Sequence, residues 1–300
     1  MANHALSRPE GAVIRQEPVP HDRWLSNRWT GNLMLTLETP PGQFVSPGTG
    51  QLSLTRGDGG EVVAQQVARA AGTPVIPGSG IKGAVRTIFE LLSFSCNPFG
   101  PRSAACDKWN CCEACSLFGL MSWSGRAGFG DAKPSSPGSV QVKVAKVPIP
   151  WLPRAERTHG EFRLYDLRES EQFDRDRRVW TKRSKELSRE VFSGELETRL
   201  NFRNVSREEL GRLLLCLGLG ADDKTRFALR LGGVKYDGKG AVLVRPRSLH
   251  LVAPRRRTLQ EEDLQKEIAG CIAEARNSEW AVKFWTGLEK LAATLGTPTS

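Results

Sequence analysis

Apolar and polar residues alternate in several short stretches of this chain, as expected of β-strands that bury one face. In the first stretch, residues 33–38, three leucines alternate with Met, Thr and Glu. The later stretches are residues 140–144, 196–202, 227–231 and 241–245. We predict a strand at each position.

Other segments have the three-to-four-residue spacing of a helix. One is residues 81–92, with Ser79 available as its N-cap. Residues 206–209 (SREE) and 258–261 (TLQE) have the capping-box pattern, so each should open a helix. A further helix is predicted around residues 280–291.

This order of elements, without its insertions, is βαββαβ, which predicts an α+β fold of the ferredoxin-like or RRM-like kind. Residues 40–60 are rich in Gly and Pro and predict a long irregular loop. Residues 148–192 are charged and lack periodicity, as in an extended insertion. The polar, Pro-rich residues 1–29 predict a tail or a cover strand.

The chain is basic, with 43 Lys and Arg against 33 Asp and Glu, a net charge of +10 over 300 residues. Such a charge favours a polyanionic partner, because binding phosphates releases their counterions. The alternative is a soluble protein that is basic without binding nucleic acid.

No apolar run approaches the roughly 20 residues of a membrane span, and the N-terminus has no signal-peptide pattern. The cysteines number seven, and five of them lie in one segment. This distribution favours reduced thiols over a disulfide framework. We expect a cytoplasmic protein without membrane contact.

The five clustered cysteines predict a structural zinc site. Cys112 and Cys115 form a C-x-x-C pair, and Cys96 and Cys106 can complete a tetrahedral set, with Cys111 as an alternative for one position. A closed shell of four thiolates is structural rather than catalytic. A redox C-x-x-C pair or buried inert thiols are the competing interpretations.

The segment IPGSGIKGAVR predicts an anion site at a helix start. Its glycines allow another backbone to come close, and Ser79, Lys82 and Arg86 offer a hydroxyl and two cations beside unpaired N–H groups. An ordinary capped helix with a solvated basic face would have the same pattern.

A second glycine-rich element is LGGVKYDGKG, residues 231–240. Gly232 and Gly233 allow close approach, Lys235 and Lys239 add charge, and Tyr236 could stack on a base. The alternative is a flexible hairpin with incidental lysines.

These segments together resemble the RAMP superfamily of CRISPR-associated proteins. The matching pieces are PVIPGSGIKGAVR, the cysteines leading to CSLFG, GRAGFGDA, FRNVSREELGRLLLCLGLG and LGGVKYDGKGAVLV. The pattern is most similar to backbone subunits of type III or type III-like effectors, the Cas-seven group. The resemblance implies that the chain polymerises along a CRISPR RNA.

The resemblance also implies a domain organisation. An RRM-like palm over residues 1–257 would carry a zinc-bearing finger at about 94–120 and a thumb at about 145–190. Residues 258–300 would form a C-terminal helical extension. Its position outside the matched segments makes it a candidate docking site.

For the site, the resemblance implies that Ser79, Lys82 and Arg86 contact the guide backbone, with residues 232–240 nearby. The implied partners are CRISPR RNA, target RNA with DNA left open, further copies of the chain, other effector subunits and a recruited nuclease.

Whether the protein cuts RNA depends on an acidic residue between the first strand and the IPGS helix, where cleaving relatives carry one. Asp58 is the candidate, with Mg²⁺ as its metal, although Asp58 also begins a D-G-G turn. We take a non-cleaving RNA scaffold as the leading hypothesis and a metal-dependent target-RNA endoribonuclease as the alternative. A guide-processing ribonuclease and an unrelated zinc-ribbon protein fit less of the pattern.

Overall fold

The structure of the protein is a computed structural model. The structure describes residues 3–7, 11–57, 59–96, 106–121, 123–148, 161–165, 172–174, 179–181, 186–220, 222–278 and 281–296.

An antiparallel sheet forms the centre of the molecule. β3 (Trp29–Glu38) lies between β15 (Glu186–Val205) and β17 (Ala241–Ala253), and both neighbours run antiparallel to it. The far edge of β15 pairs with β9 (Ala127–Phe129) and β10 (Lys133–Pro134). In chain order the sheet reads fourth, first, third, second, which is the split βαβ arrangement expected of a βαββαβ chain.

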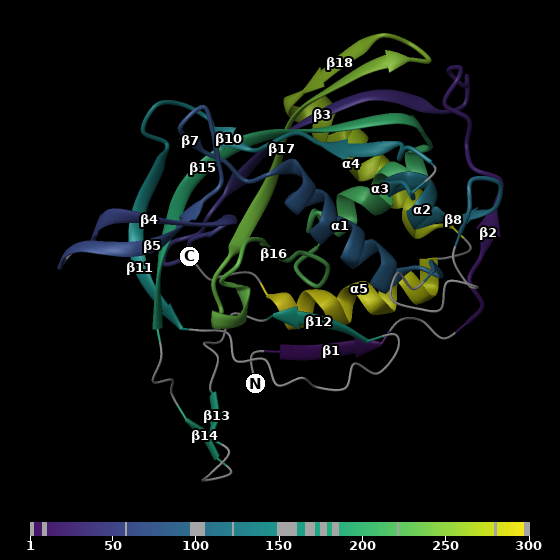
Figure 1. The fold of residues 1–300 in the computed structure, drawn as a ribbon. Helices are drawn as coiled ribbons and strands as arrows, with labels where there is room; N and C mark the ends of the chain where they lie inside the picture. The colour runs from purple at the N-terminus through teal and green to yellow at the C-terminus, as the bar shows by residue number, and fades with distance from the viewer. Residues whose placement is uncertain are drawn as a thin grey trace.

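Helices cover one side of this curved sheet (Figure 1). α1 (Gly78–Leu92) and α3 (Arg207–Cys216) are the two helices of the βαββαβ plan. α4 (Glu261–Arg276) packs on α3 and β17, and α5 (Ala281–Leu295) packs on α1. Their buried side chains belong to the same hydrophobic cluster as those of the sheet. The predicted boundary at residue 257 therefore does not separate two cores.

The two predicted capping boxes have different outcomes. At α3, Ser206 Oγ accepts from the Glu209 N–H at 3.0 Å, and Glu209 Oε2 accepts from the Ser206 N–H at 2.8 Å, so this box is confirmed. The box at Thr258 is wrong. Residues Arg257–Gln260 form β18, which pairs with β17, and the Thr258 hydroxyl bonds His250 instead. Strand pairing outweighs the local helix signal there.

The predicted irregular loop at 40–60 is also wrong over much of its length. It contains β4 (Gly48–Gly57), which forms an antiparallel hairpin with β5 (Gly60–Val67). The glycines on either side concealed the alternation of apolar and polar residues at positions 52–55 (LSLT). This hairpin projects from the end of the molecule opposite α2 and β8 (Figure 1).

Two further strand predictions need correction. The stretch 140–144, predicted as the second strand of the palm, lies in β11 (Val140–Pro148), which pairs with the first half of β15 beyond the palm. The short strands β9 and β10 occupy the second palm position instead. The stretch 227–231 holds only the short β16 (Leu229–Arg230), and all five residues are buried, so its apparent alternation did not mark an exposed face.

The N-terminal segment covers other parts of the chain. β1 (Asn3–Ser7) pairs with β12 (Glu161–Tyr165), and β2 (Arg15–Gln16) pairs with β8 (Cys111–Cys112). This agrees with the cover-strand interpretation. The remaining short elements are β6 (Arg69–Ala70), β7 (Thr73–Pro74), α2 (Glu113–Phe118), β13 (Gln172–Asp174) and β14 (Val179–Thr181). Much of the predicted thumb lies outside the described residues.

Candidate metal centre and nucleic-acid interface

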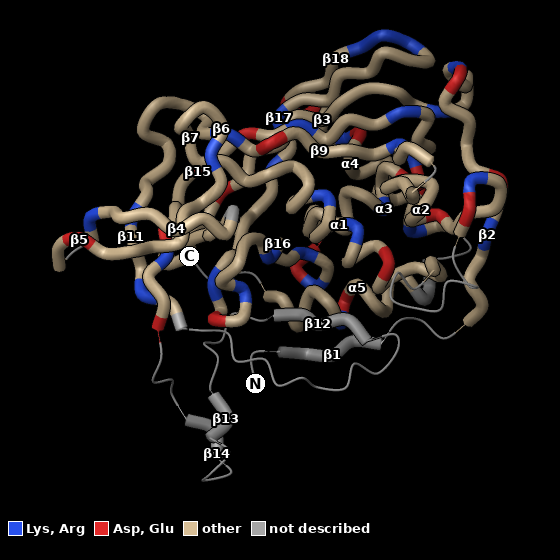
Figure 2. The backbone as a smooth tube through the Cα atoms, in the orientation of Figure 1, with Lys and Arg blue, Asp and Glu red and all other residues tan. Residues whose placement is uncertain are grey.

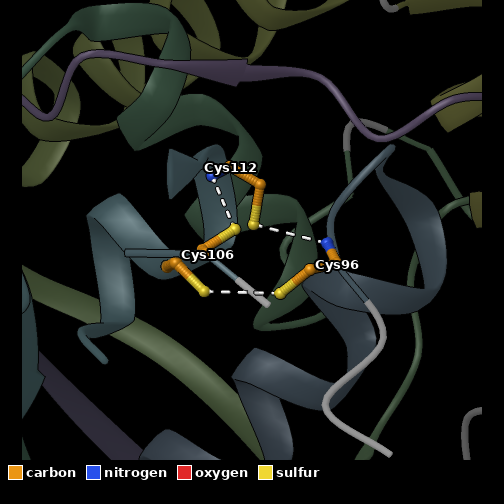
Figure 3. A group of neighbouring side chains, drawn as sticks. Cys96, Cys106 and Cys112 are labelled. Carbon is orange, nitrogen blue, oxygen red and sulfur yellow. Dashed lines mark hydrogen bonds between the residues drawn. The ribbon is translucent and has the colours of Figure 1, made fainter. Parts of the chain in front are cut away.

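Four cysteines converge beside the end of α1. Cys96 follows that helix, Cys112 ends β8, and Cys115 lies in α2. Their sulfurs and that of Cys106 all lie within 4.8 Å of one another, and Figure 3 shows three of them turned inward. Four thiolates at about 2.3 Å from zinc lie roughly 3.8 Å apart, so the cluster has the size of a tetrahedral site.

Cys111 is buried but does not belong to this group. The favoured set of Cys96, Cys106, Cys112 and Cys115 is therefore the one that converges. The pairing of β8 with β2 explains the choice, because adjacent strand residues point to opposite faces and only one of Cys111 and Cys112 can face the cluster.

Backbone and side-chain donors surround the sulfurs. The Cys112 N–H donates to Cys106 Sγ at 3.2 Å, and the Cys96 N–H donates to Cys112 Sγ at 3.4 Å. Hydrogen bonds from Cys115 and Cys96 lower the pKa of Cys112. The bond to Cys112, together with burial, raises the pKa of Cys96 to about 12. These hydrogen bonds therefore favour the ionised form of Cys112, and a bound divalent metal would favour ionisation of all four cysteines.

The start of α1 differs from its predicted form. The helix begins at Gly78, and its N-cap is Pro77, without a side-chain cap bond. The Gly78 N–H donates to Asp131 Oδ1 at 2.8 Å, so an acid from the GRAGFGDA segment caps this helix in place of Ser79. A Cβ on Gly78 would lie 2.2 Å from the Phe129 carbonyl oxygen, which explains the glycine.

Beyond Gly78, the first turns of α1 are open. Ser79 is exposed, and Cβ atoms on Gly80 and Gly83 would meet nothing within 4 Å. Lys82 has no ion-pair partner among the described residues. Burial and then the charge of Arg86 lower its pKa. This surface offers backbone, a hydroxyl and a cation to solvent.

Arg86 does not share that surface. Its Nε donates to Glu90 at 2.7 Å, Nη1 to the Gly119 carbonyl at 2.9 Å, and Nη2 to Cys115 Sγ at 3.7 Å. We therefore correct its expected role as a phosphate ligand, because its donors already tie α1 to Cys115 and Gly119, in and just after α2.

The second glycine element is packed rather than flexible. Residues Lys235–Asp237 form a short 3-10 helix, η2. The Gly233 N–H donates to the Ser46 carbonyl at 2.8 Å, and the Gly240 N–H donates to the Phe44 carbonyl at 2.9 Å. The loop therefore lies fixed on residues 44–46.

This packing changes the predicted roles within the loop. Tyr236 is only 9% exposed, so the expectation that it stacks on a base is wrong. Lys235 is half-buried, and burial lowers its pKa. Lys239 does reach the surface, where its Nζ lies 5.7 Å from the centre of the Phe44 ring. Sequence reasoning missed Phe44, because it lies in a segment predicted to be an irregular loop.

Asp58, the candidate catalytic residue, lies outside the described residues. Its neighbours Gly57 and Gly60 pair across the tip of the β4–β5 hairpin, and Glu61 on β5 is exposed.

Basic positions occur on α1 and at the turn between β17 and β18 (Figure 2).

The sequence model of the RAMP superfamily matches residues 45–296, most of the chain. The chain belongs to the RAMP superfamily. This match begins before β4 and includes α4 and α5, which agrees with their sharing one core.

Membership in the RAMP superfamily supports a CRISPR-associated, RNA-binding role. No curated protein matches the chain. None of the helices in the described part of the chain is both long and apolar enough to cross a membrane.

Proposed function

We propose that this RAMP protein is a CRISPR RNA-binding backbone subunit of a type III or type III-like effector, of the Cas-seven group. In this role it polymerises along the guide and positions target RNA. The family match and the split βαβ palm support the proposal. The observation that carries it is the open start of α1.

At that start, a phosphate backbone can approach without meeting a side chain at Gly80 or Gly83. The N–H groups of Gly78, Gly80 and Ile81 already donate to Asp131 and to the Pro77 carbonyl, so the expected anion site of free N–H groups is not present at these three residues. The exposed Ser79 supplies a hydroxyl, and Lys82 supplies a charge without a competing carboxylate in the described structure. These groups recognise phosphate rather than bases. Such binding suits a subunit that repeats along a guide of any sequence.

The four cysteines are proposed to hold a structural zinc ion. A thiolate shell without an open position offers zinc no substrate site. Arg86 links the centre to α1 through Cys115 and Glu90. The metal would therefore support the helix whose start binds the guide.

The proposed partners are CRISPR RNA, target RNA, further copies of this chain, other effector subunits and a recruited nuclease. Residues 145–190 are the proposed thumb, a range that includes the end of β11 and the start of β15. A DNA target is the alternative to RNA. Comparing capture of matched RNA and DNA targets by the purified complex would decide between them.

Target cleavage is a separate proposal and rests on Asp58 with Mg²⁺. The assembled complex carrying Asp58→Ala should bind guide and target normally and lose cleavage. Glu61→Ala, at the exposed neighbour, is the matched control. A wild-type complex that leaves target RNA intact in Mg²⁺ rules cleavage out and leaves the scaffold role standing.

The test of the main proposal is co-expression with a CRISPR array, followed by sequencing of the RNA that co-purifies and measurement of the mass of the assembly. We expect uniform RNAs with a repeat-derived end and several protein copies per RNA. Lys82→Glu should reduce the RNA recovered, whereas Lys266→Glu on α4 should not. Heterogeneous RNA at the level of an unrelated basic protein would refute the proposal.

A further inference from the structure

An aromatic ring with two ammonium groups lies where three distant segments meet. Lys143 on β11 and Lys239 in the glycine loop place their Nζ atoms 5.8 and 5.7 Å from the centre of the Phe44 ring. Neither lysine has a carboxylate partner among the described residues. Two like charges on one ring repel each other, so the arrangement favours an anion between them.

The ring is held in place by backbone. The Gly240 N–H donates to the Phe44 carbonyl at 2.9 Å, and the next residue, Val45, exchanges two hydrogen bonds with Phe192 of β15 at 2.9 and 3.0 Å. Gln43 Nε2 donates to the Gly238 carbonyl at 3.2 Å. Phe44 is therefore presented by a rigid platform, although it is only half-buried.

A third cation faces the same junction. A Cβ on Gly233 would lie 2.3 Å from Arg189 Nη1, so the guanidinium packs directly over that glycine. The Nε of Arg189 is buried and has no hydrogen-bond partner in the described structure. Gly233 in turn bonds Ser46, two residues from Phe44. The glycine thus makes room for the guanidinium, which adds a positive charge beside residues 44–46.

We infer that Phe44, Lys143, Lys239 and Arg189, here called the Phe44 site, bind one nucleotide of a single-stranded RNA. The lysines leave the ring to hold the adjoining phosphates, and the base or ribose packs on the ring they uncover. A cation over an exposed ring is held weakly, so phosphate is the stronger partner. Stacking on an aromatic residue inside a basic groove is a general way to hold single strands.

This inference rests on the proposed function, because it names a contact for the same RNA. It differs from the α1 start in chemistry, since a ring adds an interaction that does not depend on salt. Loss of the ring and loss of the charges therefore give different signatures in one experiment.

The experiment measures binding of fluorescein-labelled U20 RNA to the full chain across a range of salt concentrations. Phe44→Leu should weaken binding about tenfold or more at every salt concentration, since stacking is lost and charge is not. The double variant Lys143→Gln with Lys239→Gln should reduce the magnitude of the slope of log K against log salt by about 1.4, because each phosphate contact on a single strand contributes about 0.7 and two are lost. Lys266→Gln with Lys290→Gln, which removes the same charge from α4 and α5, should change neither.

A second measurement needs no variant. Wild-type protein is cross-linked to U20 carrying 4-thiouridine, and the modified peptides are identified by mass spectrometry. Cross-links at Phe44 or its immediate neighbours are expected.

The outcomes separate this inference from the proposed function. Three results would overturn the Phe44 site and leave the RNA-binding role intact, provided that the wild type binds RNA. They are unchanged binding by Phe44→Leu, equal salt slopes for the two lysine double variants, and cross-links found only elsewhere in the chain. Tighter binding of dT20 than of U20 overturns its assignment to RNA. If the wild type binds neither strand, both proposals fail.

Discussion

The two glycine-rich elements look alike in sequence and differ in the structure. At the start of α1, Gly80 and Gly83 border open space. In residues 231–240, a Cβ on Gly232 would lie 2.9 Å from the Ser46 backbone nitrogen, and one on Gly240 would lie 2.4 Å from the Leu231 carbonyl oxygen. The first set leaves room for a molecule from outside, and the second leaves room for the protein's own backbone. A glycine-rich motif therefore identifies a ligand site only after its neighbours are known.

The two elements also differ in what supports them. α1 is tied by Arg86 to the cysteine cluster, whereas the second loop is tied to residues 44–46. Cys112→Ser should abolish stoichiometric zinc binding and expose the end of α1 to hydrogen exchange, while residues 231–240 keep their protection. Zinc supplies about 10–16 kcal/mol of apparent binding free energy in small finger peptides, so the segment from Cys106 to Cys115 should unfold without it.

Cys111→Ser is the matched control, because that thiol lies outside the group of four. Metal content and exchange of both variants are measured by mass spectrometry. Full zinc occupancy in Cys112→Ser, or loss of zinc in Cys111→Ser, would contradict the ligand assignment.

Packing at the second loop predicts a large cost for a single methyl group. Gly232 has φ +84° and lies against Ser46. Gly232→Ala should lower the free energy of unfolding by about 2–4 kcal/mol, from the left-handed backbone and from the close contact.

Gly72→Ala isolates the backbone part of that cost, since Gly72 has φ +80° with nothing within 4 Å of its Cβ position. Urea unfolding of both variants gives the difference. Equal losses would mean that Gly232 is not constrained by packing.

Near the same loop, the buried Glu190 predicts a dependence on pH. Its carboxylate accepts from Arg69 at 2.6 and 3.1 Å and from the Val67 N–H at 3.1 Å. Burial opposes ionisation, but these bonds prevail and lower the pKa of Glu190. Its contribution is therefore complete above the ordinary glutamate pKa of 4.5 and is lost as pH falls through the lower folded value.

Glu190→Gln should cost about 1–3 kcal/mol at neutral pH and flatten the loss of stability in acid. Thermal melting of both proteins between neutral and acid pH measures this. If the two curves stay parallel, Glu190 does not account for the acid sensitivity of this region.

At the open element the expected stability change is small and opposite in sign. Gly83→Ala places a methyl group in open space within a helix, so it should stabilise the fold by about 1 kcal/mol or less. The same methyl group should weaken RNA binding if a phosphate backbone approaches this face. Unfolding and U20 binding are measured on one preparation. Unchanged binding would show that the guide does not approach Gly83.

Two short-range signals were read correctly from sequence. The capping box of α3 satisfies its own bonds within four residues, and the cysteine spacing brought the favoured four together. The βαββαβ order also emerged, because strands and helices differ in hydrophobic period. Other predictions were wrong where a residue's bonding partner is not its neighbour in sequence. Residues 258–260, expected to cap α4, instead pair with β17 as part of β18.

The cysteine cluster and the chain order of strands and helices were thus decided by the sequence itself, since the four cysteines lie within twenty residues and each element has its own hydrophobic period. Tertiary structure decided that Arg86 faces inward, that Tyr236 is buried and that Phe44 meets two lysines. Those outcomes depend on which strands pair and in which register. Such long-range pairing is set by the whole core, so no local pattern of residues records it.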